Sequence, residues 1–260
     1  MLIDTHAHIH AADYPLSPVE VLATAKTADV AKIICVGTDT DDSQLATQFA
    51  AKHGMCYATI GQHPHEAKQG ARVYQKLASI INAPKVVAVG ECGLDYYYEH
   101  SPRSDQKIAF RFQIELALEH KKPLIFHVRD QKSSDGTPTA FDDFFEILDE
   151  YKGINGVIHS FTSGKANLQK ALKRNLYIGL NGIMTFTQDQ GQLAAAKEVP
   201  LGKLVLETDA PFLAPLPTRG KPNQPAYVEH VAQFLSEHRG EPLKELKAVT
   251  TANAKKLFGI

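Results

Sequence analysis

The sequence predicts an α/β protein that folds as a single-domain (β/α)8 barrel over residues 1–260. Short apolar runs rich in β-branched residues recur along the chain, and helical patterns lie between them. Several of these runs are almost continuously apolar, which is typical of parallel strands buried on both faces. The expected strands are 2–8, 32–38, 56–62, 86–92, 123–129, 156–161, 176–181 and 204–209. Because alternation alone also fits an open doubly wound sheet, that fold remains the alternative.

Local signals place the helices between these strands. Ser17-Pro18-Val19-Glu20 has the sequence of a capping box with proline at the first helical position. Ser101-Pro102 predicts the start of a helix that runs to about residue 120, and apolar residues spaced i, i+3, i+4, i+7 form a stripe over 141–148. Further helical candidates are 41–53, 68–81, 164–174, 189–198, 225–238 and 243–257. The proline-rich segment 211–225 follows a strand directly, so we expect a long loop there rather than a linker.

Composition argues against several classes of protein. The 28 Lys and Arg against 29 Asp and Glu give a net charge of −1, which disfavours a protein that coats nucleic acid through a cationic surplus. Three cysteines without a C-x-x-C pair fit neither a disulfide framework nor a zinc ribbon, and reduced thiols suit the cytoplasm. No Lys or Arg precedes Lys26 and no apolar run is long enough to cross a bilayer, so we expect neither a signal peptide nor a membrane anchor. No sequence feature indicates an obligate protein partner.

Histidine is the residue type that points to chemistry. The chain has 12 His against 3 Cys, and H-x-H in the first strand places His6 and His8 on one face. Ionisable residues also stand at the carboxyl ends of other expected strands, where barrel enzymes carry their function. Together these residues are His6, His8, His63, Glu91, His127, His159 and Asp209. Burying them without a cation is costly. Even without His63, the other four histidines and the two carboxylates exceed the four ligands of a usual zinc site, so we predict two metal ions.

Sequence blocks along nearly the whole chain carry a resemblance to a known family. The blocks are 3–8 (IDTHAH), 61–65 (GQHPH), 90–96 (GECGLDY), 123–129 (PLIFHVR), 159–162 (HSFT), 206–213 (LETDAPFL), 217–225 and 251–253. On these blocks the chain resembles the TatD family of metal-dependent hydrolases, within the amidohydrolase-like barrels. H-x-H alone is a weak signal, but all of the blocks in this order are highly specific.

The resemblance implies roles for the residues at the strand ends. The implied ligands are His6, His8 and Asp209 for one metal, His127 and His159 for the second, and Glu91 as the bridge between them. Asp209 would also accept a proton from the nucleophile. His63 would be a catalytic or additional metal-site residue, together with Glu207. Arg129 would either hold a phosphate oxygen or form an ion pair on the barrel rim.

The resemblance further implies hydrolysis of a phosphodiester, as in a deoxyribonuclease, by a water that two divalent ions activate. We expect zinc in the protein as purified, Mg²⁺ or Mn²⁺ to support turnover, and DNA or a small phosphoester as the substrate. The alternatives are hydrolysis of a small ester, lactone or amide, a metal-binding protein without turnover, and a metal-free barrel such as an isomerase. Lys85 lies at the opposite end of its strand from Glu91, which disfavours relatives that bridge their metals with a carboxylated lysine. The chain departs from the family pattern at Ser160, and at Pro222 and Gln224, where the last loop has one cation fewer.

Aromatic side chains near the strand ends are able to stack on nucleobases. They are Tyr96, Tyr97, Tyr98, Phe161 and Phe186, and we expect most of them to pack against the barrel rim instead. His10 and His65 lie just beyond strand ends and are expected beside the site. Cys92 neighbours Glu91 in its strand, so strand alternation should turn the thiol into the core.

Overall fold

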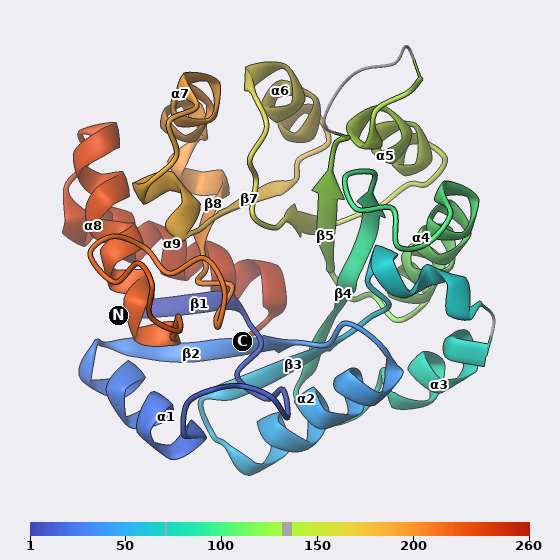
Figure 1. The fold of residues 1–260 in the computed structure, drawn as a ribbon, viewed down its shortest axis with the longest axis horizontal. Helices are drawn as coiled ribbons and strands as arrows, with labels where there is room; N and C mark the ends of the chain where they lie inside the picture. Colours follow the sequence, from blue (N-terminus) through green and yellow to red (C-terminus); the bar gives the residue numbers. More distant parts are fainter. Residues whose placement is uncertain (71, 132–136) are drawn as a thin grey trace.

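One sheet of eight parallel strands forms a barrel in the computed structural model, which describes residues 1–70, 72–131 and 137–260 (Figure 1). The strands follow one another around the sheet in chain order, from β1 to β8. A bridge between Ala7 and Ala210 joins the two ends of the sheet, and the Asp209 amide donates to the His6 carbonyl over 2.8 Å. The predicted (β/α)8 barrel is therefore confirmed. The doubly wound alternative is wrong, because β1 and β8 lie side by side.

The elements alternate as the sequence predicts, with the helices outside the sheet (Figure 1). The strands are β1 (Leu2–Ala7), β2 (Val30–Val36), β3 (Cys56–Ile60), β4 (Val86–Asp95), β5 (Leu124–Arg129), β6 (Gly156–Ile158), β7 (Tyr177–Leu180) and β8 (Leu204–Leu206). The α-helices are α1 (Pro18–Thr27), α2 (Thr40–Lys52), α3 (Arg72–Ile80), α4 (Arg103–Glu119), α5 (Ala140–Asp149), α6 (Lys165–Lys173), α7 (Gln190–Glu198), α8 (Val228–Arg239) and α9 (Leu243–Phe258). Short 3₁₀ helices are η1 (Pro64–Gln69), η2 (Gly182–Thr185), η3 (Leu201–Lys203) and η4 (Pro225–Tyr227).

Strand ends around the mouth of the barrel differ from the sequence prediction. β6 ends at Ile158 and β8 at Leu206, which is earlier than predicted. Ser160 and Asp209 have left-handed backbone conformations, with φ of 48° and 60°, so the chain leaves the extended conformation at both residues. β4 instead continues to Asp95, beyond its predicted end at 92. Polar side chains after β6 and β8 therefore stand on loops rather than on strands.

Two predicted helix starts are also corrected. The Ser17 side chain makes no hydrogen bond to α1, so the predicted capping box is wrong. A capping box forms instead at α5, between Thr139 and Asp142. In place of the predicted helix 68–81, η1 ends at Gln69, followed by Gly70, whose φ of 65° favours glycine, and α3 begins at Arg72.

An apolar core fills the barrel below the mouth. One buried cluster joins strand side chains to the end of α9, and it contains Ile3, Ile34, Val36, Ala88, Ile125, Val157, Tyr177, Val205, Ala254, Leu257 and Phe258. A larger cluster packs the outer strand faces against the helices and includes Cys35, Cys56 and Cys92. All three thiols are free and buried, and Cys92 lies in this outer layer as predicted. Among the described residues, no helix is both long and apolar enough to span a membrane.

Candidate metal centre and active site

Two imidazoles from β1 and the loop after it face each other at the mouth. His6 Nε2 and His8 Nε2 lie 3.2 Å apart. The other ring nitrogen of His8, Nδ1, lies 2.8 Å from the Val36 carbonyl, which can only accept, so Nδ1 carries the proton and Nε2 keeps its lone pair. A lone pair aimed at a second imidazole is satisfied either by a proton on His6 Nε2 or by a cation held between the two rings. This is the usual arrangement of a metal-binding histidine whose other nitrogen is fixed by a carbonyl.

Asp209 completes this first group of donors from the loop after β8. Its Oδ1 atom lies 3.4 Å from His8 Nε2 and 3.7 Å from His6 Nε2. The left-handed conformation of Asp209 and its amide hydrogen bond to the His6 carbonyl hold the carboxylate beside β1. Burial opposes ionisation, but His8, His159 and His6 lower the pKa of Asp209. The carboxylate is therefore charged at neutral pH.

Glu91 lies between two groups of histidines, and its two oxygens face opposite ways. Oε2 is 3.4 Å from His6 Nε2, whereas Oε1 is 2.7 Å from His127 Nδ1 and 3.6 Å from His159 Nε2. The side chain is buried, which opposes the charge, yet the surrounding imidazoles hold the pKa of Glu91 well below its usual range. A carboxylate that presents one oxygen to each group has the geometry to bridge two cations.

His127 is held between two carboxylates. Its Nδ1 contacts Glu91, and its Nε2 donates to Asp95 Oδ2 over 3.0 Å. Burial disfavours the charged ring, but the hydrogen bonds to Asp95 and Glu91 raise the pKa of His127 to about 9. β4 approaches β5 closely here, because a Cβ atom on Gly93 would lie 2.0 Å from the His127 carbonyl oxygen. Asp95 thus fixes which nitrogen of His127 is turned toward Glu91.

His159 has an equivalent partner in Glu207. Its Nδ1 lies 2.9 Å from Glu207 Oε1, and the ring stacks on His6 with 3.6 Å between centroids. Burial opposes the charge, but Glu207 and Glu91 raise the pKa of His159 to about 10. Gly179 leaves the space for this carboxylate, since a Cβ atom there would lie 2.4 Å from Glu207 Oε2. Glu207 therefore contacts His159, and not His63, with which the sequence prediction paired it.

His63 differs from the other imidazoles in its hydrogen bonding. Its Nδ1 accepts from the His65 amide over 3.2 Å, and its Nε2 lies 3.7 Å from Glu91 Oε1. Burial, followed by the charge of His127, holds the pKa of His63 well below its usual range. A neutral ring that accepts at Nδ1 carries its proton on Nε2. His63 therefore presents an N–H donor to the mouth.

Arg129 stands at the exposed end of β5. Its guanidinium lies over the rings of Tyr97 and Tyr98, at 4.2 and 4.8 Å from their centroids. No ion pair joins it to a carboxylate among the described residues, so the alternative of a rim ion pair finds no partner there. Of the other aromatic residues singled out from the sequence, Tyr96 and Phe161 are buried, and Tyr96 donates to Asp143 over 2.6 Å.

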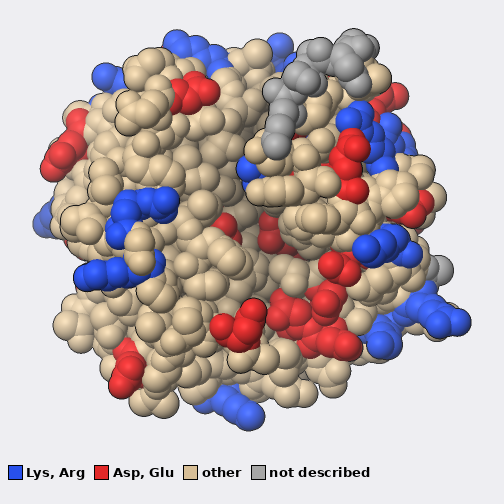
Figure 2. Space-filling view, in the orientation of Figure 1, with Lys and Arg blue, Asp and Glu red and all other residues tan. Residues whose placement is uncertain are grey.

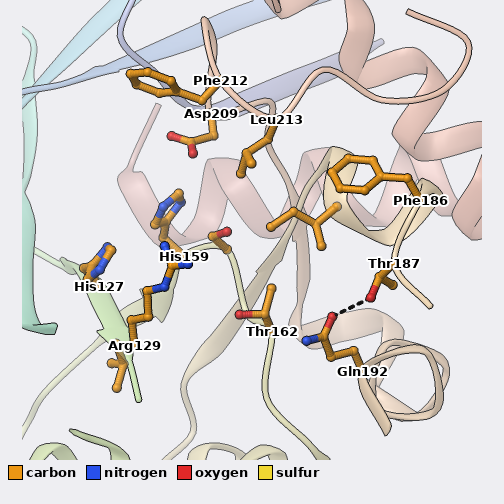
Figure 3. Close-up of a pocket in the computed structure, with 13 residues that line it drawn as sticks. His127, Arg129, His159, Thr162, Phe186, Thr187, Gln192, Asp209, Phe212 and Leu213 are labelled. Carbon is orange, nitrogen blue, oxygen red and sulfur yellow. Dashed lines mark hydrogen bonds between the residues drawn. The ribbon is translucent and has the colours of Figure 1, made fainter. Parts of the chain in front are cut away.

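The donors open onto a continuous hollow. A cavity of about 530 Å³ is lined by His127, Val128, Arg129, His159, Ser160, Thr162, Ile183, Phe186, Thr187, Gln192, Asp209, Phe212 and Leu213 (Figure 3). A smaller cavity of about 320 Å³ shares His127, His159 and Asp209 with it and is also lined by Asp39 and Glu66. Figure 2 shows acidic side chains gathered beside one part of the hollow. An anionic ligand is therefore favoured on the side that carries Arg129.

Two buried carboxyl groups in the site were missed from the sequence. Asp95 accepts from His127, from His65 over 3.1 Å and from two backbone amides, and its pKa is lowered despite burial. Asp4 lies beneath His6, and burial raises the pKa of Asp4 to about 8, although Thr208 hydrogen bonds oppose this shift. Asp95 stands within the sequence block 90–96 that carries the family resemblance, and this position could have indicated its role. His65 and His10 both lie beside the site as expected. His65 contacts Asp95, and the His10 ring, which pairs with Asp42 over 3.0 Å, lies with its centroid 6.3 Å from that of His8.

The donor set fits divalent metal ions. Three groups have ligand atoms within 4.8 Å of one another: His6, His8 and Asp209; His6, His159 and Glu207; and His63, Glu91 and His127. Imidazole and carboxylate donors together suit zinc, manganese or iron. The structure thus brings together every residue that the sequence predicted as a metal ligand. Their roles as ligands belong to the proposal below.

Comparisons with known proteins find relatives that match nearly the whole chain. The family model described as TatD related DNase matches residues 3–259. YabD of Bacillus subtilis (strain 168), an uncharacterized metal-dependent hydrolase, is 38% identical over 263 residues and covers 100% of both chains. The 3'-5' ssDNA/RNA exonuclease TatD of Citrobacter rodentium is 36% identical over 93% of this chain and 91% of its own. The crystal structure of YJJV, a TatD homologue from Escherichia coli K12, superposes with a TM-score of 0.89 at 27% identity, covering 100% of this chain and 98% of that one.

Proposed function

The chain belongs to the TatD related DNase family of metal-dependent hydrolases, and from that premise we propose that it cleaves phosphodiester bonds in single-stranded nucleic acid with two divalent ions. The observation that carries the proposal is the placement of Glu91, whose two oxygens face separate groups of imidazoles. A relative of this chain is named as an exonuclease of single-stranded DNA and RNA, which supports this class of substrate.

The residues present fit two metal ions. In the proposal His6, His8 and Asp209 would hold one ion, His127 and His159 would hold the other, and Glu91 would contribute to both. When bound, such ions polarise a phosphoryl group and lower the pKa of water. We expect zinc as purified, with Mg²⁺ or Mn²⁺ also supporting turnover.

The side chains around the ligands supply the remaining chemistry. Asp209, charged at neutral pH, accepts the proton of the attacking water. Arg129, positioned on Tyr97, holds the non-bridging phosphate oxygens with its planar fork of donors. The Nε2–H group of His63 donates a hydrogen bond to the negative charge that develops on the phosphoryl oxygens in the transition state.

A second candidate is hydrolysis of a small phosphoester, since the same ligands and Arg129 serve any phosphate. A panel of single-stranded DNA, single-stranded RNA, duplex DNA, bis(p-nitrophenyl) phosphate, a phosphomonoester and p-nitrophenyl acetate separates the two. The protein is first stripped of metal and then reloaded with zinc, manganese or magnesium. We expect two ions per chain and the highest kcat/KM on single strands. Full activity in chelator, or a preference for the carboxylic ester, contradicts the proposal.

A matched pair of variants tests the site itself. Glu91→Gln keeps the volume of the side chain but removes the charge between the two groups of imidazoles. Glu245→Gln makes the same change in the first turn of α9, away from the mouth. We expect the first variant to lose activity on every phosphodiester of the panel and the second to match the wild type. Equal activity of both variants refutes the role of Glu91.

A further inference from the structure

The large mouth cavity extends well beyond the candidate metal ligands. We propose that this extension is a nucleobase slot, in which Phe186 is the stacking surface and Gln192 the hydrogen-bonding edge. The inference deepens the proposed function and rests on it, because a base reaches the slot when its phosphate lies at the metal ligands. The two ends of the cavity differ in the chemistry of the side chains that line them.

One end of the cavity suits a phosphate and the other suits a planar, mostly apolar group. His127, His159, Asp209 and Arg129 line the first end, and Ile183, Phe186, Thr187, Gln192 and Leu213 line the second. Figure 3 shows Phe186 and Gln192 across the hollow from Arg129 and His159. A nucleotide has this same division, with a charged phosphate joined through a sugar to a flat ring. The cavity volume of about 530 Å³ leaves room for one such unit.

Phe186 is held as a rigid platform at the end of η2. Its amide donates to the Ile183 carbonyl over 3.1 Å. The Arg219 guanidinium lies 4.0 Å from the ring centroid and donates to the Ala214 carbonyl over 3.1 Å, so one face of the ring is occupied by a fixed cation. Among the described residues, Phe186 contacts no second aromatic ring. The half-buried ring also lines the cavity, and in the proposed slot its face opposite Arg219 stacks on the base.

Gln192 presents a defined donor to the same space. The Thr187 hydroxyl accepts from the Asp189 amide over 3.2 Å, so its own proton is free to donate to Gln192 Oε1 over 2.9 Å. This bond fixes the orientation of the amide group. Figure 3 shows the Gln192 nitrogen turned toward Thr162 and the hollow. That nitrogen has no hydrogen-bond partner within the described part of the chain.

These two contacts define what the slot recognises. Every nucleobase has a flat face to stack and at least one carbonyl oxygen or ring nitrogen that accepts from an amide. The slot therefore takes any base, but the base must be unstacked from its neighbours and free at its edge. A base-paired nucleotide inside a duplex is stacked on both faces and has its Watson–Crick edge occupied, so it does not enter the slot without leaving the stack.

The test compares ligands that differ only in the base. Binding of dAMP and of 2-deoxyribose 5-phosphate to the metal-loaded protein is measured by calorimetry. We expect the wild type to prefer dAMP by at least about tenfold, because base–aromatic stacking has typical effects of roughly 5- to 100-fold on substitution by alanine. Phe186→Ala and Gln192→Ala should each reduce that preference. Phe186→Leu, which keeps an apolar side chain without a π face, should reduce it as well.

Matched controls and a cleavage assay separate the possible failures. Phe112→Ala alters a ring that stacks on Tyr74 instead of lining the cavity, and Gln190→Ala alters the same helix two residues earlier, so both should keep the wild-type preference. Equal binding of the two ligands by the wild type overturns the slot. So does an equal loss for both ligands in Phe186→Leu. If the wild type prefers dAMP and the Phe186 and Gln192 variants lose that preference, but no nucleic acid is cleaved, the slot stands and the proposed nuclease function fails.

Discussion

Asp95→Asn is the substitution that tests most directly how the site is positioned. In the structure, Asp95 Oδ1 accepts from the amides of Tyr97 and Tyr98, both over 2.9 Å. Oδ2 accepts from His127 Nε2 over 3.0 Å and from His65 Nε2 over 3.1 Å. Asparagine would keep its one oxygen on the two backbone amides, because those donors cannot change. Its NH₂ group would then face the two imidazoles.

The consequence falls on His127. Its Nε2–H would meet an N–H donor, so the neutral ring would move its proton to Nδ1 and accept from the new amide. Nδ1 lies 2.7 Å from Glu91 Oε1, so it would donate there instead of offering a lone pair to a metal ion. Loss of such an orienting carboxylate costs about 10- to 100-fold in metal affinity, which is about 1.4–2.7 kcal/mol. We expect this loss at one of two metal ions, because His6 and His8 do not contact Asp95.

The assay is a competition titration of the metal-free protein with zinc against a coloured chelator, with metal per chain counted by mass spectrometry. Nitrogen NMR of the metal-free variant reports the His127 tautomer. Asp143→Asn is the control, since Asp143 is also buried and accepts from Tyr96, but lies outside the mouth contacts. Wild-type affinity at both sites in Asp95→Asn would refute the reasoning. Equal losses in both variants would show general destabilisation instead.

Three further outcomes are expected. Glu91→Ala should lower the metal content below two ions per chain and reduce kcat by about 10²- to 10³-fold, and wild-type turnover would remove the two-metal model. Arg129→Ala should reduce kcat/KM on phosphodiesters by about 10- to 100-fold but much less on neutral esters, whereas equal losses on both would leave Arg129 a structural residue. Metal affinity should rise with pH, because His127 and His159, with pKa values raised to about 9 and about 10, must lose protons to bind. Below pH 9, metal affinity should fall about tenfold per pH unit for each proton that the metal displaces. Calorimetry in buffers of different ionisation enthalpy should show that metal binding releases protons. If no protons are released, the assigned protonation of these two rings is wrong.

The order of elements was predictable because it depends on local patterns. Apolar runs marked the strands, and the strand-end positions of His127 and Glu91 in the sequence were enough to place both at the mouth. The exact strand ends were not predictable. Ser160 and Asp209 leave the strand conformation because of contacts far away in the chain, such as the Asp209 amide on the His6 carbonyl and the Ser160 amide on Glu207. Sequence periodicity contains no signal for such contacts.

The partners of the predicted ligands were harder to identify than the ligands. Glu207 was assigned beside His63 from the family resemblance, although it contacts His159. Strand alternation could not correct this assignment, because it shows which face a side chain takes but not its neighbour across the barrel. Asp95 was missed for a related reason. It lies beyond the predicted end of its strand, and the extension of β4 depends on the close approach at Gly93. Local sequence gives no measure of that approach.

Helix α4 shows how the fold keeps these partners in place. Gln106 accepts from the Asp95 amide over 2.8 Å and donates to the Asp95 carbonyl over 3.1 Å. Seven residues later, Gln113 accepts from the Gln62 amide over 2.7 Å and donates to the Gln62 carbonyl over 3.0 Å. Both glutamines are fully buried and lie two turns apart, on one face of the helix. A single helix therefore fixes the backbone of Asp95 and that of the residue before His63, so the orientation of the imidazoles depends on the packing of α4 as much as on the strands.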